Sequence, residues 1–110
     1  MFLYRNIMKS KKAKLLPKDY RLLEALGENI RLARLRRNLT MQQVADRANI
    51  GRSSLWHIEK GSEHIGIGMI LKVLSVLGLE EDLKKVGSDD ILGRKIQDAQ
   101  LITKKRGSKK

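Results

Sequence analysis

Residues 39–61 have the sequence LTMQQVADRANIGRSSLWHIEKG and predict two short helices joined by a tight turn. Thr40 suits the N-cap of the first helix, because its hydroxyl can accept a hydrogen bond from a backbone N–H that has no partner within the helix. Gln43 follows three residues later, at the spacing of a capping box. Asn49 stands at the expected end of this helix, where left-handed backbone is tolerable. Capping residues in the sequence therefore mark both the start and the end of the first helix.

The second helix of this segment is expected to begin at Arg52 and to bury Leu55 and Ile58. On that assignment four side chains turn outward: Arg52, Ser53, Trp56 and His57. Two helices in this order form a helix-turn-helix, whose second helix enters the DNA major groove. These four residues are therefore the predicted base readers. The Arg52 fork can bind guanine O6 and N7 together, whereas Ser53 can serve a base or a phosphate and His57 a base edge.

Trp56 has two interpretations from the sequence. Its ring could press on a thymine methyl group or on the sugar-phosphate wall, or it could pack in the core or in a dimer. The predicted phosphate contacts are clearer, because helix N-termini and nearby polar or cationic groups suit phosphate oxygens. The residues assigned to this role are Thr40, Gln42, Gln43, Lys60 and Ser62.

The same segment carries the pattern L-T-x-x-x-V-A-x-x-A-x-I-x-x-S-x-L-x-x-I-E-x-G, which resembles the lambda-repressor and Cro-like group of XRE-type regulators. The resemblance covers residues 24–86 and implies an all-α, five-helix lambda-repressor-like DNA-binding domain. It also implies an ion pair between Arg34 and Glu59, a homodimer, and a palindromic operator in double-stranded DNA. Two positions depart from the pattern: Met41 stands where a phosphate-contacting Gln is usual, and Gly66 where a Ser or Thr usually caps the fourth helix.

Three further runs resemble HipB-type antitoxin regulators, which are encoded beside HipA-like kinase toxins. They are L-x-x-L-G-E-N-I-R-L-A-R-L-R-R, then G-I-G-M-I-L-K-V-L-S-V-L-G-L-E-E-D-L, then L-G-R-K-I-Q-D-A. This narrower resemblance implies repression of the chain's own operon and contact with the kinase or its companion subunit.

Composition agrees with a nucleic-acid partner. The 110 residues include 24 Lys and Arg against 12 Asp and Glu, so the net charge is +12, which is typical of polycations that bind nucleic acid. The alternative is a scaffold or adaptor that uses this charge for acidic protein partners or RNA. The chain has no cysteine, no apolar run long enough to span a membrane and no signal-peptide pattern, so we expect a soluble, cytoplasmic, nucleoid-associated protein.

No arrangement of residues in the sequence predicts an active site or a bound cofactor. The only histidines, His57 and His64, lack the convergent ligands that a metal needs, and His57 and Glu59 point apart on one helix. Phosphate-binding loops, zinc-protease helices and Ser-His-Asp arrangements are also missing. The sequence therefore predicts neither an enzyme nor a metal site.

Three regions are expected along the chain: a basic N-terminal arm at 1–18, the helix-turn-helix domain at 19–87 and a C-terminal extension at 88–110. Apolar periodicity predicts the first helix at 20–37, a fourth at 66–77 and a fifth at 79–86, with Gly27 as a modest propensity penalty in the first. The arm is either a solvated, disordered tail or a basic arm that lies along DNA.

Residues 88–102 carry a short apolar pattern that is too short to fold alone. This segment could fold back on the domain, pair with a second protomer or dock into a partner protein, and it is the candidate site for the kinase. Residues 103–110 are basic, contain Gly and Ser, and are expected to be disordered.

Overall fold

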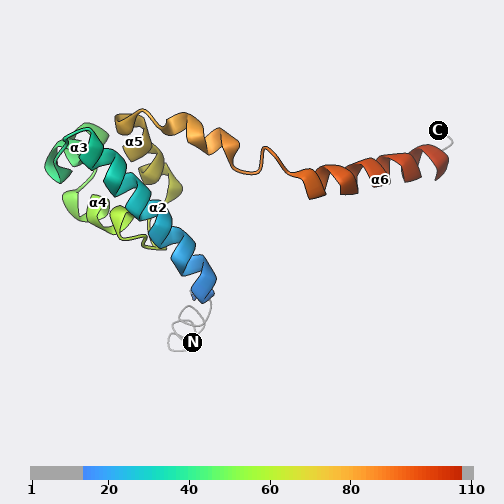
Figure 1. The fold of residues 1–110 in the computed structure, drawn as a ribbon, viewed down its shortest axis with the longest axis horizontal. Coiled ribbons are helices and arrows are strands. Elements are labelled where there is room, and N and C mark those ends of the chain that lie inside the picture. Colours follow the sequence, from blue (N-terminus) through green and yellow to red (C-terminus); the bar gives the residue numbers. More distant parts are fainter. Residues whose placement is uncertain (1–13, 108–110) are drawn as a thin grey trace, which may run out of the picture. The chain divides into compact units, whose positions relative to one another are not determined.

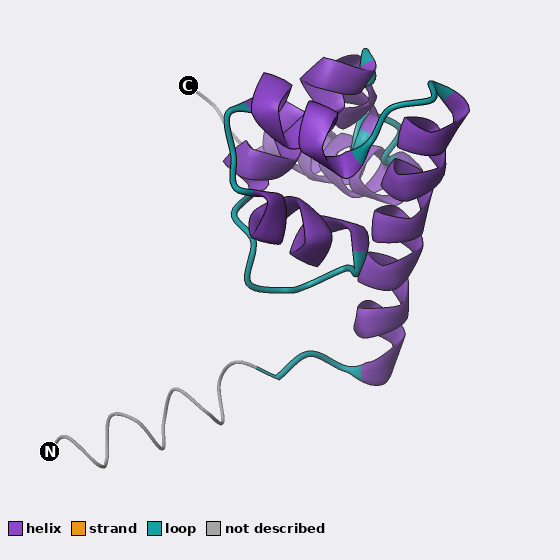
Figure 2. Ribbon diagram, turned by 90° about the vertical axis from the view of Figure 1, so that its left-hand side faces the viewer, coloured by secondary structure: helices purple, strands orange, loops and turns teal. Residues whose placement is uncertain are grey.

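The computed structural model describes residues 14–107, with side chains as far as residue 102, and every regular element in it is helical (Figures 1 and 2). The elements are α2 (Pro17–Arg36), α3 (Met41–Ala48), α4 (Arg52–Glu59), α5 (Ile67–Leu77), the 3₁₀ helix η1 (Glu80–Lys85) and α6 (Ile91–Gly107). The predicted all-α class is confirmed. The chain divides into two compact units between Glu80 and Glu81, whereas the sequence placed the end of the domain at residue 87.

The first unit is built around one apolar core to which each of its four helices contributes a face. Helix α3 packs against both α4 and α5, and α2 also packs against both of them. The buried apolar residues are Ile30, Ala33, Val44, Ala45, Ala48, Leu55, Ile58, Val73, Leu74 and Leu77. Because the chain has no cysteine, this packing holds the unit together without disulfides.

Helix α2 begins three residues earlier than the predicted start at residue 20. Pro17 occupies the first turn, where its fixed φ fits a helix and its missing N–H costs nothing. Tyr20 then ties this turn to the loop after α4, because its hydroxyl donates a hydrogen bond of 2.9 Å to Glu63 Oε1. The structure thus makes Pro17 and residue 18 part of the helix, although the sequence assigned them to the N-terminal arm, of which residues 1–13 lie outside the described part.

Two glycines let α2 approach the end of α4 more closely than side chains would allow. A Cβ atom added at Gly27 would lie 2.5 Å from the carbonyl oxygen of Glu59, and one added at Gly61 would lie 2.5 Å from that of Leu23. Gly61 also has a φ of +78°, which glycine adopts readily. Beside its predicted propensity penalty, Gly27 therefore has a packing role, because its missing side chain permits the contact.

The second unit differs from the prediction at both of its helices. The fifth helix expected at 79–86 is a 3₁₀ helix, Glu80–Lys85, that buries no residue, and Val86 beyond it is 79% exposed. This segment therefore lacks the buried apolar face that was expected of the fifth helix. Helix α6 then extends to Gly107, so residues 103–107 are helical where disorder was expected. The remaining residues 108–110 lie outside the described part.

Candidate nucleic-acid interface

The turn between α3 and α4 is held by hydrogen bonds at both ends of α3. Thr40 Oγ1 accepts a hydrogen bond from the Gln43 backbone N–H at 3.1 Å, and Gln43 Oε1 accepts one from the Thr40 N–H at 2.9 Å. This is the predicted capping box. At the other end Asn49 has a left-handed backbone with φ 56°, which stops α3 and redirects the chain toward α4. The angle between the two helices therefore follows from local sequence.

Helix α4 presents one buried and one exposed face. Leu55 and Ile58 are buried in the core. The four predicted base readers, Arg52, Ser53, Trp56 and His57, are all exposed. Arg52 and Ser53 form the N-terminal end of this exposed face, because α4 begins at Arg52.

A shallow cavity of about 630 Å³ joins the start of α3 to the start of α4. Thr40 and Gln42 line it from one side and Arg52 from the other. Two predicted phosphate contacts and the first predicted base reader thus share one surface.

Several of the predicted phosphate contacts also make hydrogen bonds within the protein. The Gln42 side-chain amide donates to Asp46 Oδ1 at 2.9 Å. In the capping box, Gln43 Oε1 accepts the hydrogen bond from the Thr40 backbone N–H. Ser62 Oγ accepts from the His64 backbone N–H at 3.2 Å. In Gln43 the backbone N–H and the side-chain oxygen are both used by the capping box, so the side-chain NH₂ is the donor that Thr40 does not bind.

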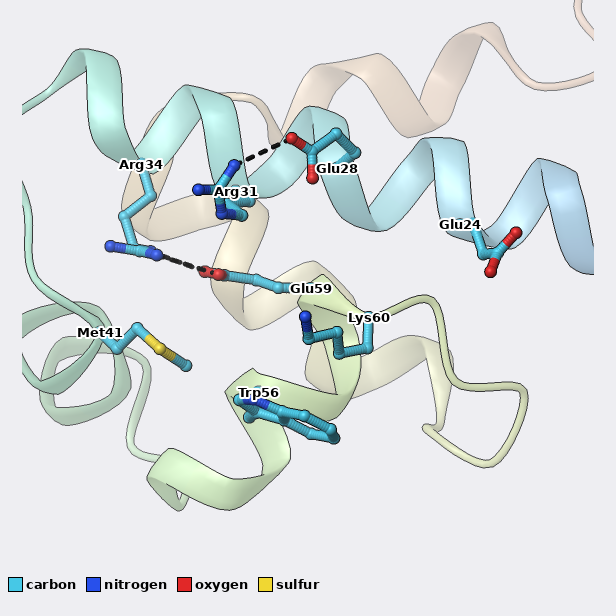
Figure 3. A pocket seen from close by; sticks show the side chains of 8 residues that line it. All are labelled: Glu24, Glu28, Arg31, Arg34, Met41, Trp56, Glu59 and Lys60. Carbon is cyan, nitrogen blue, oxygen red and sulfur yellow. Dashed lines mark hydrogen bonds and ion pairs between the residues drawn. The ribbon is translucent and has the colours of Figure 1, made fainter.

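Trp56 lies at the surface, with 49% of its area exposed, so the core interpretation of this residue is wrong. Its ring meets the His57 ring edge-on at 5.0 Å between centroids, and Lys60 Nζ lies 5.5 Å from its centroid. Figure 3 shows Trp56 and Met41 lining the same cavity of about 420 Å³. The Gln expected at position 41 is thus replaced by an apolar side chain beside an aromatic one.

The ion pair implied by the resemblance is present and buried. Arg34 Nε donates to Glu59 Oε2 at 2.6 Å and Arg34 Nη2 donates to Glu59 Oε1 at 3.0 Å, a two-pronged contact between α2 and the end of α4 (Figure 3). Arg34 also donates to the Leu39 carbonyl at 3.0 Å. The hydrogen bond to Glu59 raises the pKa of Arg34 above its ordinary value. The pair therefore ties α2 to the end of α4.

Two features of this region were not predicted from the sequence. Asn38 has a left-handed φ of 55° just before α3, and the frequency of Asn in such positions was the available signal. Arg31 and Glu28 form a second, exposed ion pair at 2.9 Å at the edge of the Trp56 cavity. Their spacing of three residues on a helix is a common pattern for such pairs.

Other kinds of site were also sought within residues 14–107. No three His, Asp or Glu side chains there converge as metal ligands would. Nor does any helix in that range have the length and apolar character needed to cross a membrane.

Comparison with known families gives one result for this chain. A family model described as a helix-turn-helix domain matches residues 25–85, which is more than half of the 110 residues. The matched range begins within α2 and ends with η1, so it includes all of α3, α4 and α5. No curated protein matched the chain.

Proposed function

Because this chain belongs to a helix-turn-helix domain family, we propose that it is a sequence-specific DNA-binding repressor that acts as a homodimer. The observation that carries the proposal is the division of α4 into a buried face and an exposed face that begins with Arg52 and Ser53. A single recognition helix reads only a few base pairs. Proteins of this kind therefore pair about a twofold axis and bind inverted half-sites about one helical turn apart.

In this proposal the starts of α3 and α4 contact different parts of the DNA. Arg52, Ser53 and His57 read base edges, and a bidentate contact from Arg52 to guanine contributes about 1–3 kcal/mol of discrimination. The groups at the start of α3, together with Lys60, bind phosphates and set the register of the protein on the duplex. The Trp56 ring contacts His57 edge-on and has Lys60 Nζ 5.5 Å from its centroid, so it neighbours one proposed residue of each kind.

We further propose that the chain is the antitoxin of a HipA-like kinase toxin-antitoxin operon and represses that operon. The three sequence runs that resemble HipB-type regulators support this step, and the helix-turn-helix family is compatible with it. The expected result is that a HipA-like kinase encoded beside this chain co-purifies with it and strengthens its binding to the operator. A kinase that neither binds the chain nor changes operator affinity would remove this part of the proposal.

The repressor proposal is tested by selecting bound sequences from a random duplex pool and measuring affinities by gel shift. We expect an enriched sequence with dyad symmetry. The double variant Arg52→Ala with His57→Ala should lose discrimination between this operator and random DNA while keeping salt-dependent binding to both. Arg21→Ala, which removes an equal charge from an exposed position on α2, is the matched control and should keep discrimination.

Two outcomes would refute the DNA-reading proposal. An adaptor would enrich no palindrome, and equal loss of affinity on operator and random DNA in the double variant would deny α4 its reading role. Salt provides an independent check: for about six neutralised phosphates, log K against log salt should have a slope near −5.

A further inference from the structure

Met41 and Trp56 form an apolar patch beside the residues that are proposed to bind DNA. Trp56 is 49% exposed, and Met41 is half-buried at the start of α3. Both line the cavity of about 420 Å³ (Figure 3). Met41 also lines the neighbouring cavity of about 630 Å³, together with Thr40 and Gln42. The apolar patch is therefore continuous with the surface that is assigned to phosphate contacts.

Helix α4 carries two exposed lines of side chains, and Trp56 lies on the line nearer to the start of α3. Residues four positions apart are neighbours on a helix surface, so Arg52 and Trp56 share one line while Ser53 and His57 share the other. Arg52 and Trp56 each line a cavity that Met41 also lines. Neither Ser53 nor His57 lines either cavity. Trp56 thus faces the proposed phosphate contacts of α3.

The Trp56 ring also neighbours the proposed phosphate contact at the end of α4. Lys60 Nζ is 5.5 Å from the ring centroid, which is within the range of a cation–π interaction. Along a DNA strand, consecutive phosphates are joined through a deoxyribose, which is uncharged and has apolar C–H faces. An aromatic ring that adjoins two groups of phosphate contacts is therefore placed beside the sugars that connect those phosphates.

The charges around the Trp56 cavity favour a sugar over a phosphate as its occupant. Three acidic and three basic residues line the cavity: Glu24, Glu28, Glu59, Arg31, Arg34 and Lys60. Four of these residues are joined in two ion pairs, Arg31 with Glu28 and Arg34 with Glu59. Because the charges balance, the cavity offers an apolar surface without a net attraction for an anion.

We propose that Met41 and Trp56 contact the deoxyribose of the DNA backbone, independently of base sequence. Trp56, which the sequence assigned to base reading, then belongs with the backbone contacts, and Met41 replaces the expected polar contact by an apolar one. This inference rests on the proposed function, because α4 must first lie against DNA. It deepens that function by separating the residues of α4 that read bases from the one that anchors the helix.

The first test is a gel-shift titration of the full chain on the selected operator and on a random duplex. Trp56→Ala should weaken binding to both duplexes by the same factor, about tenfold, because an apolar contact is lost from each. The slope of log K against log salt should stay unchanged, since no charge is removed. Lys60→Ala should instead make this slope less steep by about 0.9.

Leu71→Ala is the matched control. It removes an apolar side chain that is 41% exposed on α5 and lines neither of the two cavities, so it should bind both duplexes as the wild type does. Trp56→Phe keeps an aromatic ring and should retain part of the affinity. Circular dichroism melting shows whether each variant folds. Wild-type affinity in Trp56→Ala, or an equal loss in Leu71→Ala, would overturn the proposal.

A thymine methyl group is the other occupant to be tested. Uracil lacks the C5-methyl group that thymine presents in the major groove. On an operator with uracil in place of thymine, the loss caused by Trp56→Ala should have the same size as on the original operator. A loss that disappears on the uracil duplex would make Trp56 a reader of thymine, and the sugar contact would be wrong.

Fluorescence of Trp56, the only tryptophan, reports the contact in the wild-type protein. Either duplex should protect it from quenching by acrylamide, and an unprotected ring in the complex would refute the contact. The results also keep the two inferences apart. Protection without an enriched palindrome would refute sequence reading alone. An enriched palindrome with an unprotected Trp56 would refute the sugar contact alone, and a chain that binds no duplex would refute both.

Discussion

Leu55 on α4 and Leu92 on α6 are the same side chain on two helices of one chain, yet Leu55 is fully buried and Leu92 is 70% exposed. The difference follows from what surrounds each helix. Helix α4 is eight residues long and is held by α2 and α3, whereas α6 has 17 residues and its unit contains no buried position between Glu81 and Ile102. A helix is therefore buried because other helices pack against it, and its own length and apolar content are not sufficient.

The largest expected difference in stability between the two units comes from removing an ion pair in each. Arg34→Ala would leave the buried Glu59 carboxylate without its partner and should lower the free energy of unfolding by about 3–5 kcal/mol. Arg94→Ala removes an exposed pair with Asp89 in the second unit and should leave this transition unchanged. Urea unfolding followed by the fluorescence of Trp56, the only tryptophan, reports the first unit. Comparable effects of the two variants would contradict the structural role of the buried pair.

Packing gives the next largest contrast. Leu55→Ala should destabilise the first unit by about 2–5 kcal/mol, because it leaves a cavity among buried side chains. Leu92→Ala should change the same transition by less than about 0.5 kcal/mol. Thermal unfolding of both variants, read by Trp56 fluorescence, makes the measurement. A strong effect of Leu92→Ala would mean that the second unit supports the first, and the distinction between them would be lost.

Glycine substitutions test how tightly the first unit is assembled. Gly27→Ala would push a methyl group into the backbone of α4 and should cost about 2–3 kcal/mol. Gly68→Ala on α5 meets nothing within 4 Å and should instead stabilise by up to about 1 kcal/mol through helix propensity. Opposite signs in chemical unfolding are the expected result. Stabilisation by both alanines would show that α2 and α4 can separate without penalty.

The smallest expected contrast compares two helix caps. Thr40→Ala removes half of the capping box and should lower the stability of the first unit by about 1 kcal/mol. Asp90→Ala removes the cap of α6 and should reduce helical circular dichroism without shifting the Trp56 transition. Were Asp90→Ala to shift that transition as Thr40→Ala does, the two units could not be unfolding separately.

Features that depend on neighbouring residues could be predicted from the sequence. The Thr40–Gln43 capping box and the left-handed Asn49 follow from side-chain chemistry within a few positions. The outward orientation of Arg52 and His57 follows from helical periodicity around Leu55 and Ile58. The Arg34–Glu59 contact spans 25 positions, and it was available only because the pattern resembles a known family.

Features that depend on tertiary contact could not be predicted. Gly27 has a low helix propensity, and only the approach of residues 32 positions later explains why a side chain is excluded there. The basic run after residue 102 has the composition of a disordered tail, yet the apolar periodicity before it continues into the same helix. Propensity describes a residue locally, whereas the exclusion of a side chain at Gly27 depends on what α2 packs against.

The glycine contacts between α2 and α4 also limit how the recognition helix can respond to an operator. With Gly27 set against the Glu59 carbonyl and Gly61 against that of Leu23, a side chain at either position would force the two segments apart. Any tilt of α4 in a groove must therefore carry α2 with it, including the turn anchored by Tyr20. In the proposed DNA-reading role, α4 would meet a groove together with α2, and we expect operators that require another angle between these helices to bind less tightly.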